Sequence, residues 1–107
     1  MNTNANMNTN ANMNNPSICI PKIVSSVTYN DINYGFQKLN IGKIDRIDIV
    51  SNYNSPSLRA FIHFEYWHNN ERANHLKNLI VNGKYFKLVY NFPWFWKCVL
   101  SNVPKPM

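Results

Sequence analysis

The sequence predicts an α+β domain in which two helices cover one face of a four-stranded antiparallel sheet. Four short segments alternate apolar and polar residues with period two, as half-buried strands do. Two other segments repeat apolar residues with helical spacing. The order along the chain is strand, helix, strand, strand, helix, strand. Two helices in this order can cover only one face of the sheet.

The first strand is expected at Ser17–Pro21 and ends at its proline. The first helix is expected to begin after Thr28, which is a suitable N-cap. Asp31 stands three residues later, where a carboxylate can accept hydrogen bonds from the free amides of the first turn. Gly42 is expected to end this helix. Its apolar stripe consists of Ile32, Phe36 and Leu39.

The other strands are expected at Lys43–Val50, Leu58–Tyr66 and Tyr85–Tyr90, with Ile44 slightly out of phase in the first of them. The second helix is expected to begin after Asn69 or Asn70 and to end at Asn82-Gly83. The result is a ferredoxin-like β-α-β-β-α-β sandwich with strand order 4-1-3-2 and one open sheet face. The core is expected to contain Ile18, Ile20, Ile32, Phe36, Ile47, Ile49, Ala60, Ile62, Phe64, Ala73, Leu76, Phe86 and Leu88.

Composition divides the chain into three parts. Residues 1–15 repeat Met-Asn-Thr-Asn-Ala-Asn twice, add Met-Asn-Asn, and contain no charged side chain. This segment has too little apolar surface to offset its ordering entropy, so we expect it to be disordered. Residues 16–91 contain the predicted elements. Residues 92–107 form an aromatic-rich C-terminal extension.

The charge of the chain favours an anionic partner. Eleven Lys and Arg residues stand against five Asp and Glu residues, which gives a net charge of +6, and all of them follow residue 15. Nucleic acid is the first candidate for such an excess, and an acidic protein or membrane surface is the second. The chain starts without the basic and apolar segments of a secretory signal, so we expect a protein that is not secreted.

No pattern in the sequence predicts catalysis. Asp45 and Asp48 are the only closely spaced acid pair on a strand, and their spacing predicts that they point to opposite faces. The three histidines lack the spacing of a metal site, and the two cysteines are too far apart to indicate a disulfide scaffold. We therefore expect no enzyme, no metal, no cofactor and no small-molecule substrate.

The third predicted strand contains the candidate binding residues. Arg59, Phe61 and His63 alternate with apolar residues and project from the open face. This combination suits single-stranded nucleic acid. The ring can stack on a base, the cation can contact phosphate, and the imidazole can donate a hydrogen bond. Alternatively, Phe61 is buried under the C-terminal extension. The same face and the route of the strand are expected to include Cys19, Lys43, Arg46, Lys87 and Lys97.

The chain resembles the RNA-recognition motif over roughly Ser17 to Tyr90. Cys19, within Ile18-Cys19-Ile20, stands where the family usually has a stacking aromatic residue. In the third-strand motif Arg59 replaces one aromatic residue, Ala60 is the small residue and Phe61 retains the second aromatic residue. A helix alanine and an Asn-Gly turn also match, at Ala73, Asn82 and Gly83. The resemblance implies binding of single-stranded RNA on the sheet face, weakened because two stacking positions are altered.

A narrower resemblance involves the C-terminal half. Gly83–Tyr90 and Phe92–Cys98 are similar to uncharacterised proteins encoded by large DNA viruses of protists, of the mimivirus and phycodnavirus kind. Ile18–Pro21 and Phe64–Trp67 fit the same group. This resemblance implies a viral protein that acts in the host cytoplasm or viral factory, or within the virion.

The aromatic run of the extension allows three interpretations. It consists of Phe92, Trp94, Phe95 and Trp96. The run can pack across the sheet as added core, present its rings to bases or to a viral or host protein, or anchor at a membrane interface, for which it is short. Two functions follow: a non-catalytic RNA-binding module, or a protein-interaction or virion-structural module whose sheet face is covered.

Overall fold

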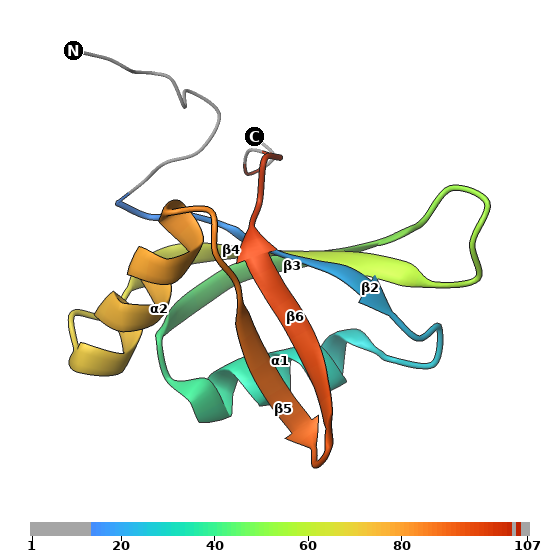
Figure 1. The fold of residues 1–107 in the computed structure, drawn as a ribbon, viewed down its shortest axis with the longest axis horizontal. Coiled ribbons are helices and arrows are strands. Elements are labelled where there is room, and N and C mark those ends of the chain that lie inside the picture. Colours follow the sequence, from blue (N-terminus) through green and yellow to red (C-terminus); the bar gives the residue numbers. More distant parts are fainter. Residues whose placement is uncertain (1–13, 104, 106–107) are drawn as a thin grey trace.

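Seven elements follow one another in the computed structural model, which describes residues 14–103 and 105 (Figure 1). The strands are β2 (Ile18–Ile23), β3 (Gly42–Ser51), β4 (Leu58–Trp67), β5 (Phe86–Asn91) and β6 (Trp94–Leu100). The helices are α1 (Tyr29–Leu39) and α2 (Glu71–Val81). The predicted order β-α-β-β-α-β is confirmed, and one further strand follows it.

The sheet has five strands in the order β3-β4-β2-β6-β5, a ferredoxin-like core with an added strand. All neighbours are antiparallel. The prediction of four strands in the order 4-1-3-2 is therefore wrong at one edge. The place beside β2 that was expected for β5 belongs to β6, which comes from the predicted extension. The segment with the aromatic run does alternate as a strand: Trp96 and Cys98 face the core, and Phe95 and Lys97 face outward. The run of apolar rings made this alternation difficult to recognise in the sequence.

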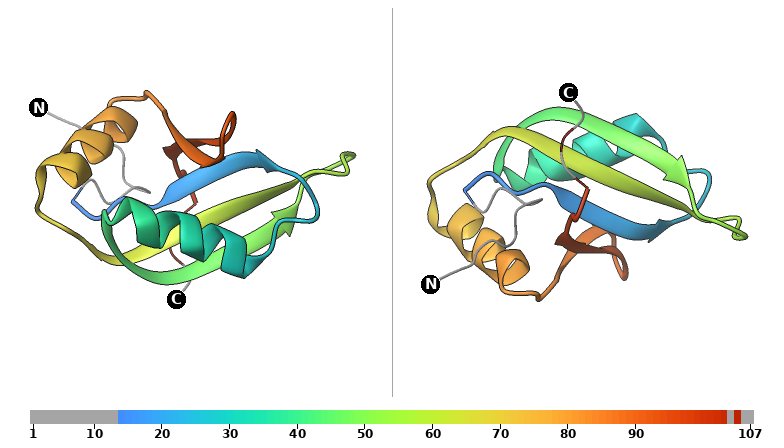
Figure 2. Two further views of the ribbon diagram at one scale, coloured as in Figure 1. Left: turned by 90° about the horizontal axis from the view of Figure 1, so that it is seen from below. Right: turned by 90° about the horizontal axis from the view of Figure 1, so that it is seen from above.

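The helices lie on one side of the sheet. In the left view of Figure 2, α1 lies in front of β3 and β4, and in the right view no helix stands in front of β2, β3 and β4. The β5–β6 hairpin pairs with β2 only at Ile18↔Leu100 and Cys19↔Val99. Beyond these two pairs the hairpin diverges from β2 (Figure 1), and residues of β5 and β6 line a cleft together with α1. The sheet is thus a three-stranded platform joined to a two-stranded arm.

The helix caps agree with the sequence. Thr28 and Asp31 form a reciprocal capping box at the start of α1, and Asn70 accepts from the Ala73 amide at the start of α2. The first helix ends earlier than expected, at Asn40 in the left-handed conformation. Gly42 instead begins β3, where a Cβ atom would lie 2.5 Å from the carbonyl oxygen of Tyr66. That close approach requires glycine.

The phase shift that was predicted at Ile44 is a bulge in β3. Ile44 pairs with Phe64 and Arg46 with His63, so Asp45 has no partner of its own in the ladder. A bulge of this kind inserts one extra residue and changes which side chains share a face. Ile44 and Ile47 can therefore both face the core although three positions separate them.

The predicted core is confirmed almost completely. All of its members are buried except Ile49 and Leu76, which are half-buried against it. The structure adds residues from strand ends, α2 and the arm, namely Ile23, Ile41, Trp67, Ile80, Trp96 and Cys98. Ile62 is fully buried and its neighbour Phe61 is not, so the predicted register of β4 is correct.

The chain enters the domain through residues that contact β4. Residues 1–13 of the predicted disordered segment lie outside the described residues. Asn15 donates from Nδ2 to the carbonyl oxygen of Phe64 at 3.0 Å. The buried carbonyl of Pro16 accepts from the indole nitrogen of Trp67 at 2.9 Å. These bonds fix the start of β2 against the end of β4.

Two tryptophans of the arm provide a matched test of this packing. Trp96 is 3% exposed and Trp94 is 63% exposed, and both are on β6. We expect Trp96→Ala to lower the free energy of unfolding by about 3–5 kcal/mol, because it removes a large side chain from the core. Trp94→Ala should change it by less than about 0.5 kcal/mol. Urea denaturation measures both values, and equal losses would contradict the packing of β6.

Candidate nucleic-acid interface

Arg59 and Phe61 lie on the sheet face opposite the helices, as predicted. Phe61 is half-buried between Cys19 on β2 and Asp48 on β3, its partners in the ladder. The guanidinium of Arg59 stands 5.7 Å from the centroid of the Phe61 ring. Arg59 is exposed and makes no ion pair within the described part of the chain. A ring and a free cation are thus available at this point, although the ring is partly covered.

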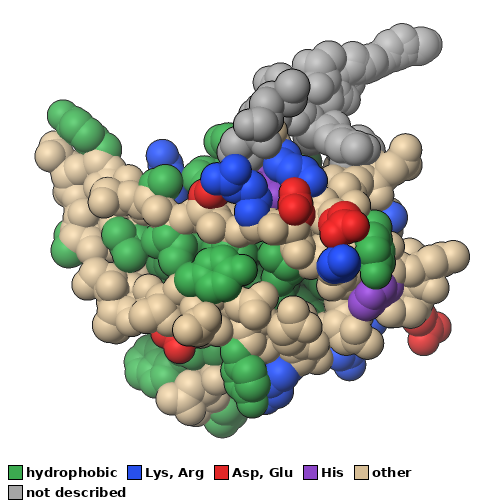
Figure 3. All heavy atoms as spheres, turned by 180° about the vertical axis from the view of Figure 1, so that it is seen from behind, with side chains coloured by type: hydrophobic (Ala, Val, Ile, Leu, Met, Phe, Trp, Pro, Cys, Tyr) green, Lys and Arg blue, Asp and Glu red, His purple; other side chains and the backbone are tan. Residues whose placement is uncertain are grey.

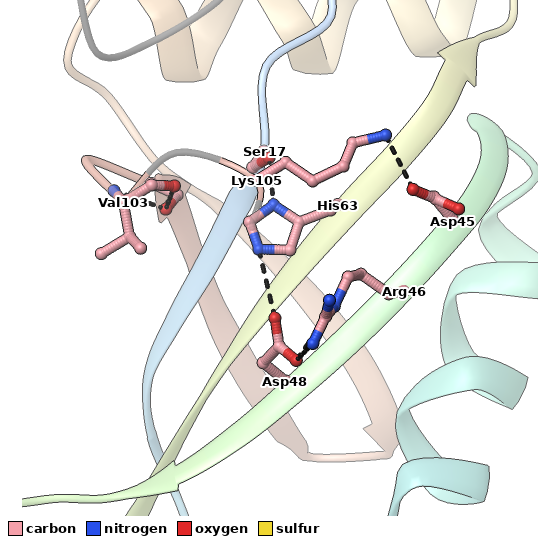
Figure 4. A network of polar contacts seen from close by, with 8 residues as sticks. Ser17, Asp45, Arg46, Asp48, His63, Val103 and Lys105 are labelled. Atoms are coloured by element: carbon pink, nitrogen blue, oxygen red, sulfur yellow. Dashed lines mark hydrogen bonds and ion pairs between the residues drawn. The ribbon is translucent and has the colours of Figure 1, made fainter. Parts of the chain in front are cut away.

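His63 is not available on the surface, which corrects its expected role. Its side chain is 1% exposed. The Ser17 hydroxyl lies 2.6 Å from Nδ1, and Asp48 Oδ2 lies 3.5 Å from Nε2, which has no hydrogen-bond partner among the described residues (Figure 4). Burial is the main cause that lowers the pKa of His63, and the nearby Asp48 carboxylate opposes it. His63 therefore has a structural position between β2 and β3.

The segment after β6 covers His63. Its path crosses in front of β2 and β4 in the right view of Figure 2. The Ser101 amide donates to the Ser17 carbonyl at 2.9 Å, and the Ser101 hydroxyl bonds to Val103 at 3.0 Å. Lys105 reaches β3 and contacts Asp45 Oδ2 at 2.7 Å. The contact with Lys105 lowers the pKa of Asp45. One end of the sheet face, at His63, is therefore occupied by the chain itself.

Acidic residues of β3 and β4 neutralise the cations that were expected on β3. Arg46 contacts Asp48 at 2.7 Å, and Lys43 pairs with Glu65 at 3.3 Å. The expectation that Asp45 and Asp48 point to opposite faces is wrong, because the bulge brings both carboxylates into the network around His63 (Figure 4). In Figure 3 acidic and basic side chains are accordingly intermingled next to the grey terminal residues. This side of the domain offers little net charge to phosphate.

The outer face of the arm has a different character. Lys87 and Lys97 are direct cross-strand partners, and neither makes an ion pair among the described residues. The ammonium of Lys87 stands 4.5 Å from the centroid of the Phe95 ring, and that of Lys97 stands 4.7 Å from the Tyr85 ring. We call Tyr85, Lys87, Phe95 and Lys97 the arm surface. The sequence indicated both lysines and Phe95, whereas Tyr85 was missed although it alternates with Lys87.

Cys19 and Val99 connect the arm surface to Phe61. They are cross-strand partners, and Cys19 also pairs with Phe61, so the three side chains form one row across the open face. Cys19 is half-buried, and burial raises the pKa of its thiol against the opposing effect of Arg59. The thiol is therefore protonated at neutral pH and adds apolar surface rather than nucleophilic character.

The aromatic run divides between core and surface. Trp96 is buried and stacks on Tyr90 with ring centroids 4.4 Å apart. Phe92 is 87% exposed at the tip of the hairpin, and Trp94 and Phe95 are also exposed. Hydrophobic side chains accordingly form the lower end of the molecule in Figure 3, where Figure 1 places the tip. Trp96 thus packs as added core, as the first interpretation predicts, whereas Phe92, Trp94 and Phe95 do not.

Comparisons of the chain with protein-family models, curated proteins and solved structures found no match. Among residues 14–103 and 105 there is no helix long and apolar enough to cross a membrane. The same residues contain no cluster of three or more metal-ligating side chains.

The buried histidine predicts how stability depends on pH. The pKa of His63 is lowered in the folded state, so the unfolded chain binds more protons at mildly acid pH. The free energy of unfolding should fall as the pH drops below about 6.5, the ordinary histidine value. Urea denaturation between neutral and mildly acid pH measures how the free energy of unfolding depends on pH, and this dependence should be weaker in His63→Gln. His75 is exposed, so His75→Gln serves as the control and should keep the pH dependence of the original chain. If His75→Gln also flattened this dependence, the assignment to His63 would be wrong.

The ion pair between Lys105 and Asp45 predicts a shift in the same titration. Lys105 lowers the pKa of His63, and Asp45 raises it. Lys105→Ala removes the cation and leaves the Asp45 carboxylate unpaired, so the pKa of His63 should rise. NMR titration of the His63 ring protons measures the change. Lys77→Ala on α2 is the control, and an unchanged His63 pKa in Lys105→Ala would show that the C-terminal segment does not cover this ring.

Proposed function

We propose that this domain is a non-catalytic module, similar to an RNA-recognition motif, that binds single-stranded RNA with low sequence specificity. The binding surface consists of the arm surface together with Arg59 and Phe61. Phosphates contact Lys87, Lys97 and Arg59, and bases stack on Phe95, Tyr85 and the exposed part of Phe61. This assignment moves the centre of binding away from β3, where ion pairs and the C-terminal segment occupy the face.

The pairing of Lys87 with Lys97 is the observation that supports this proposal most strongly. Like charges directly opposite each other on neighbouring strands destabilise a sheet. Here no described carboxylate compensates them. An anionic ligand that bridges the two ammonium groups would remove the repulsion. The two rings beside them add a stacking surface that every base can use, which favours single strands over duplexes.

The distances within the sheet suit a strand of several nucleotides. Phe61 and Val99 are two strands apart, which corresponds to about 10 Å. Lys97 lies two residues further along β6, which adds roughly 7 Å. A single strand that runs from Arg59 across Cys19 and Val99 onto the arm surface would therefore meet cations at both ends and an apolar row between them. Its backbone need not approach Asp45 or Asp48.

A protein-interaction module remains the second candidate, and the tip of the hairpin favours it. Phe92 and Trp94 are 87% and 63% exposed, and Val89 and Tyr90 beside them are 54% and 44% exposed. Several exposed apolar side chains at the end of one hairpin are typical of a protein contact. The covered sheet face at His63 also agrees with this function. The two candidates use different surfaces, so they can be separated by mutation.

RNA binding is tested by the fluorescence anisotropy of a labelled uridine-rich single strand. Three phosphate contacts predict a log–log salt slope of about −2. The double variant Lys87→Gln/Lys97→Gln should flatten the slope by about 1.4, because two contacts are lost. Phe95→Ala should weaken binding by about 1–3 kcal/mol and leave the slope unchanged, because it removes stacking only.

The controls for this experiment match each change in kind. Lys77→Gln removes a lysine from α2, and Tyr53→Ala removes a ring that is 91% exposed in the β3–β4 loop. Both should bind RNA as the original chain does. If the original chain does not bind at low salt, or if Lys77→Gln weakens binding as much as either lysine of the arm, the RNA proposal fails. The interaction module would then replace it.

A further inference from the structure

A cleft of about 440 Å³ separates α1 from the β5–β6 hairpin. It lies on the helix side of the sheet, because Leu88 and Trp96, which face the core, form part of its wall. The arm surface lies on the other side of the same two strands. Sites for small ligands in proteins have volumes of about 300–1,000 Å³. The cleft is therefore large enough for a small molecule and is distinct from the proposed RNA surface.

The base of the cleft is apolar, and its walls are aromatic. Val27, Leu39, Leu88 and Trp96 provide the apolar base beside Gly35. A Cβ atom at Gly35 would lie 3.2 Å from the Trp96 ring and 3.3 Å from a Leu88 methyl group, so glycine allows the hairpin to approach the helix closely. Tyr90 stacks on Trp96 on the hairpin side, and Tyr34 stands on the helix side with 65% of its surface exposed. Both sides of the cleft thus offer an aromatic ring that a flat ligand can contact.

Cations lie at the mouth of the cleft. Lys38 projects from α1 with its ammonium 5.4 Å from the centroid of the Tyr34 ring, and Arg72 projects from the first turn of α2. Asp31 is the acidic residue of the lining, and its carboxylate accepts a hydrogen bond from the Thr28 amide in the capping box. Lys87 also borders the cleft, but its ammonium lies over Phe95 on the opposite face. The lining thus contains the cations Lys38 and Arg72 against a single acid, Asp31, which already accepts a hydrogen bond in the helix cap.

We propose that this cleft binds a small aromatic compound that bears a phosphate or carboxylate group. Its ring would lie between Tyr34 and the Tyr90–Trp96 stack. Its anionic group would meet Lys38 and Arg72, and Lys38 already lies against the Tyr34 ring. The combination of an apolar base, two aromatic walls and cations at the mouth is selective for a ligand that has both a ring and a charge. This site goes beyond RNA binding and does not depend on it.

The indole resonances of the full chain, labelled with ¹⁵N, provide the test. Trp96 lies at the base of the cleft, whereas the indole of Trp67 is bonded to Pro16 in the core and serves as an internal control. Adenosine 5′-monophosphate, with a ring and a phosphate, should shift the Trp96 resonance saturably in the millimolar range or below. Adenosine and inorganic phosphate, which each lack one part, should bind more weakly. Indole-3-acetate shows whether a carboxylate replaces the phosphate.

Exposed residues of the cleft supply the variants. Tyr34→Ala and Lys38→Ala should each raise the dissociation constant about threefold to tenfold without unfolding the chain. Tyr53→Ala and Lys77→Ala should leave it unchanged. Lys97→Gln, which changes the arm surface at a residue that does not line the cleft, should also keep this binding even if it weakens RNA binding, so the two proposals can fail separately. The proposal is overturned if neither aromatic anion gives a saturable shift of Trp96, or if Tyr34→Ala and Tyr53→Ala bind equally well.

Discussion

The burial of Trp96 between the hairpin and α1 is the interaction on which the rest of the architecture depends. Trp96 and Leu88 pack against Gly35, which has no side chain to keep them away from the helix. This contact holds the arm on the helix side, while only two residue pairs join β6 to β2. The arm can therefore diverge from the platform and still share its core. Both the arm surface and the cleft exist because of this divergence.

The chain uses its own C-terminal segment and its acidic residues to close one part of the sheet face. Lys105 contacts Asp45, and the buried His63 lies between Ser17 and Asp48. An imidazole in this position stays neutral more readily than one on a free surface, because burial opposes its charge. Arg59, Lys87 and Lys97 lie outside this network and make no ion pair among the described residues. Charge pairing thus decides which part of a basic domain can attract an anion.

Most residues of the candidate site could be predicted from the sequence, but several other residues predicted for it turned out to be buried or paired. The alternation of β4 correctly placed Arg59 and Phe61 on the open face, and the alternation of β5 did so for Lys87. His63 alternates in step with Arg59 and Phe61, so the sequence placed it on the same face. It is nevertheless buried, because the segment after β6, which is distant in the sequence, lies over it. Arg46 and Lys43 also have the predicted positions in the ladder, yet their partners Asp48 and Glu65 neutralise them. Local alternation contains no information about such contacts.

The sequence by itself determined the α+β class, the order of the first six elements, the positions of the helix caps and the larger part of the core. These features depend on hydrophobic periodicity and on hydrogen bonds within a few residues, and both are local. Only the tertiary structure decided that β6 lies beside β2, that Asp45 shares a face with Asp48, and that a cleft opens beside α1. Strand order, bulges and clefts arise from competition among distant segments for the same partners. The free energy of that competition is a property of the whole packed chain rather than of any one segment.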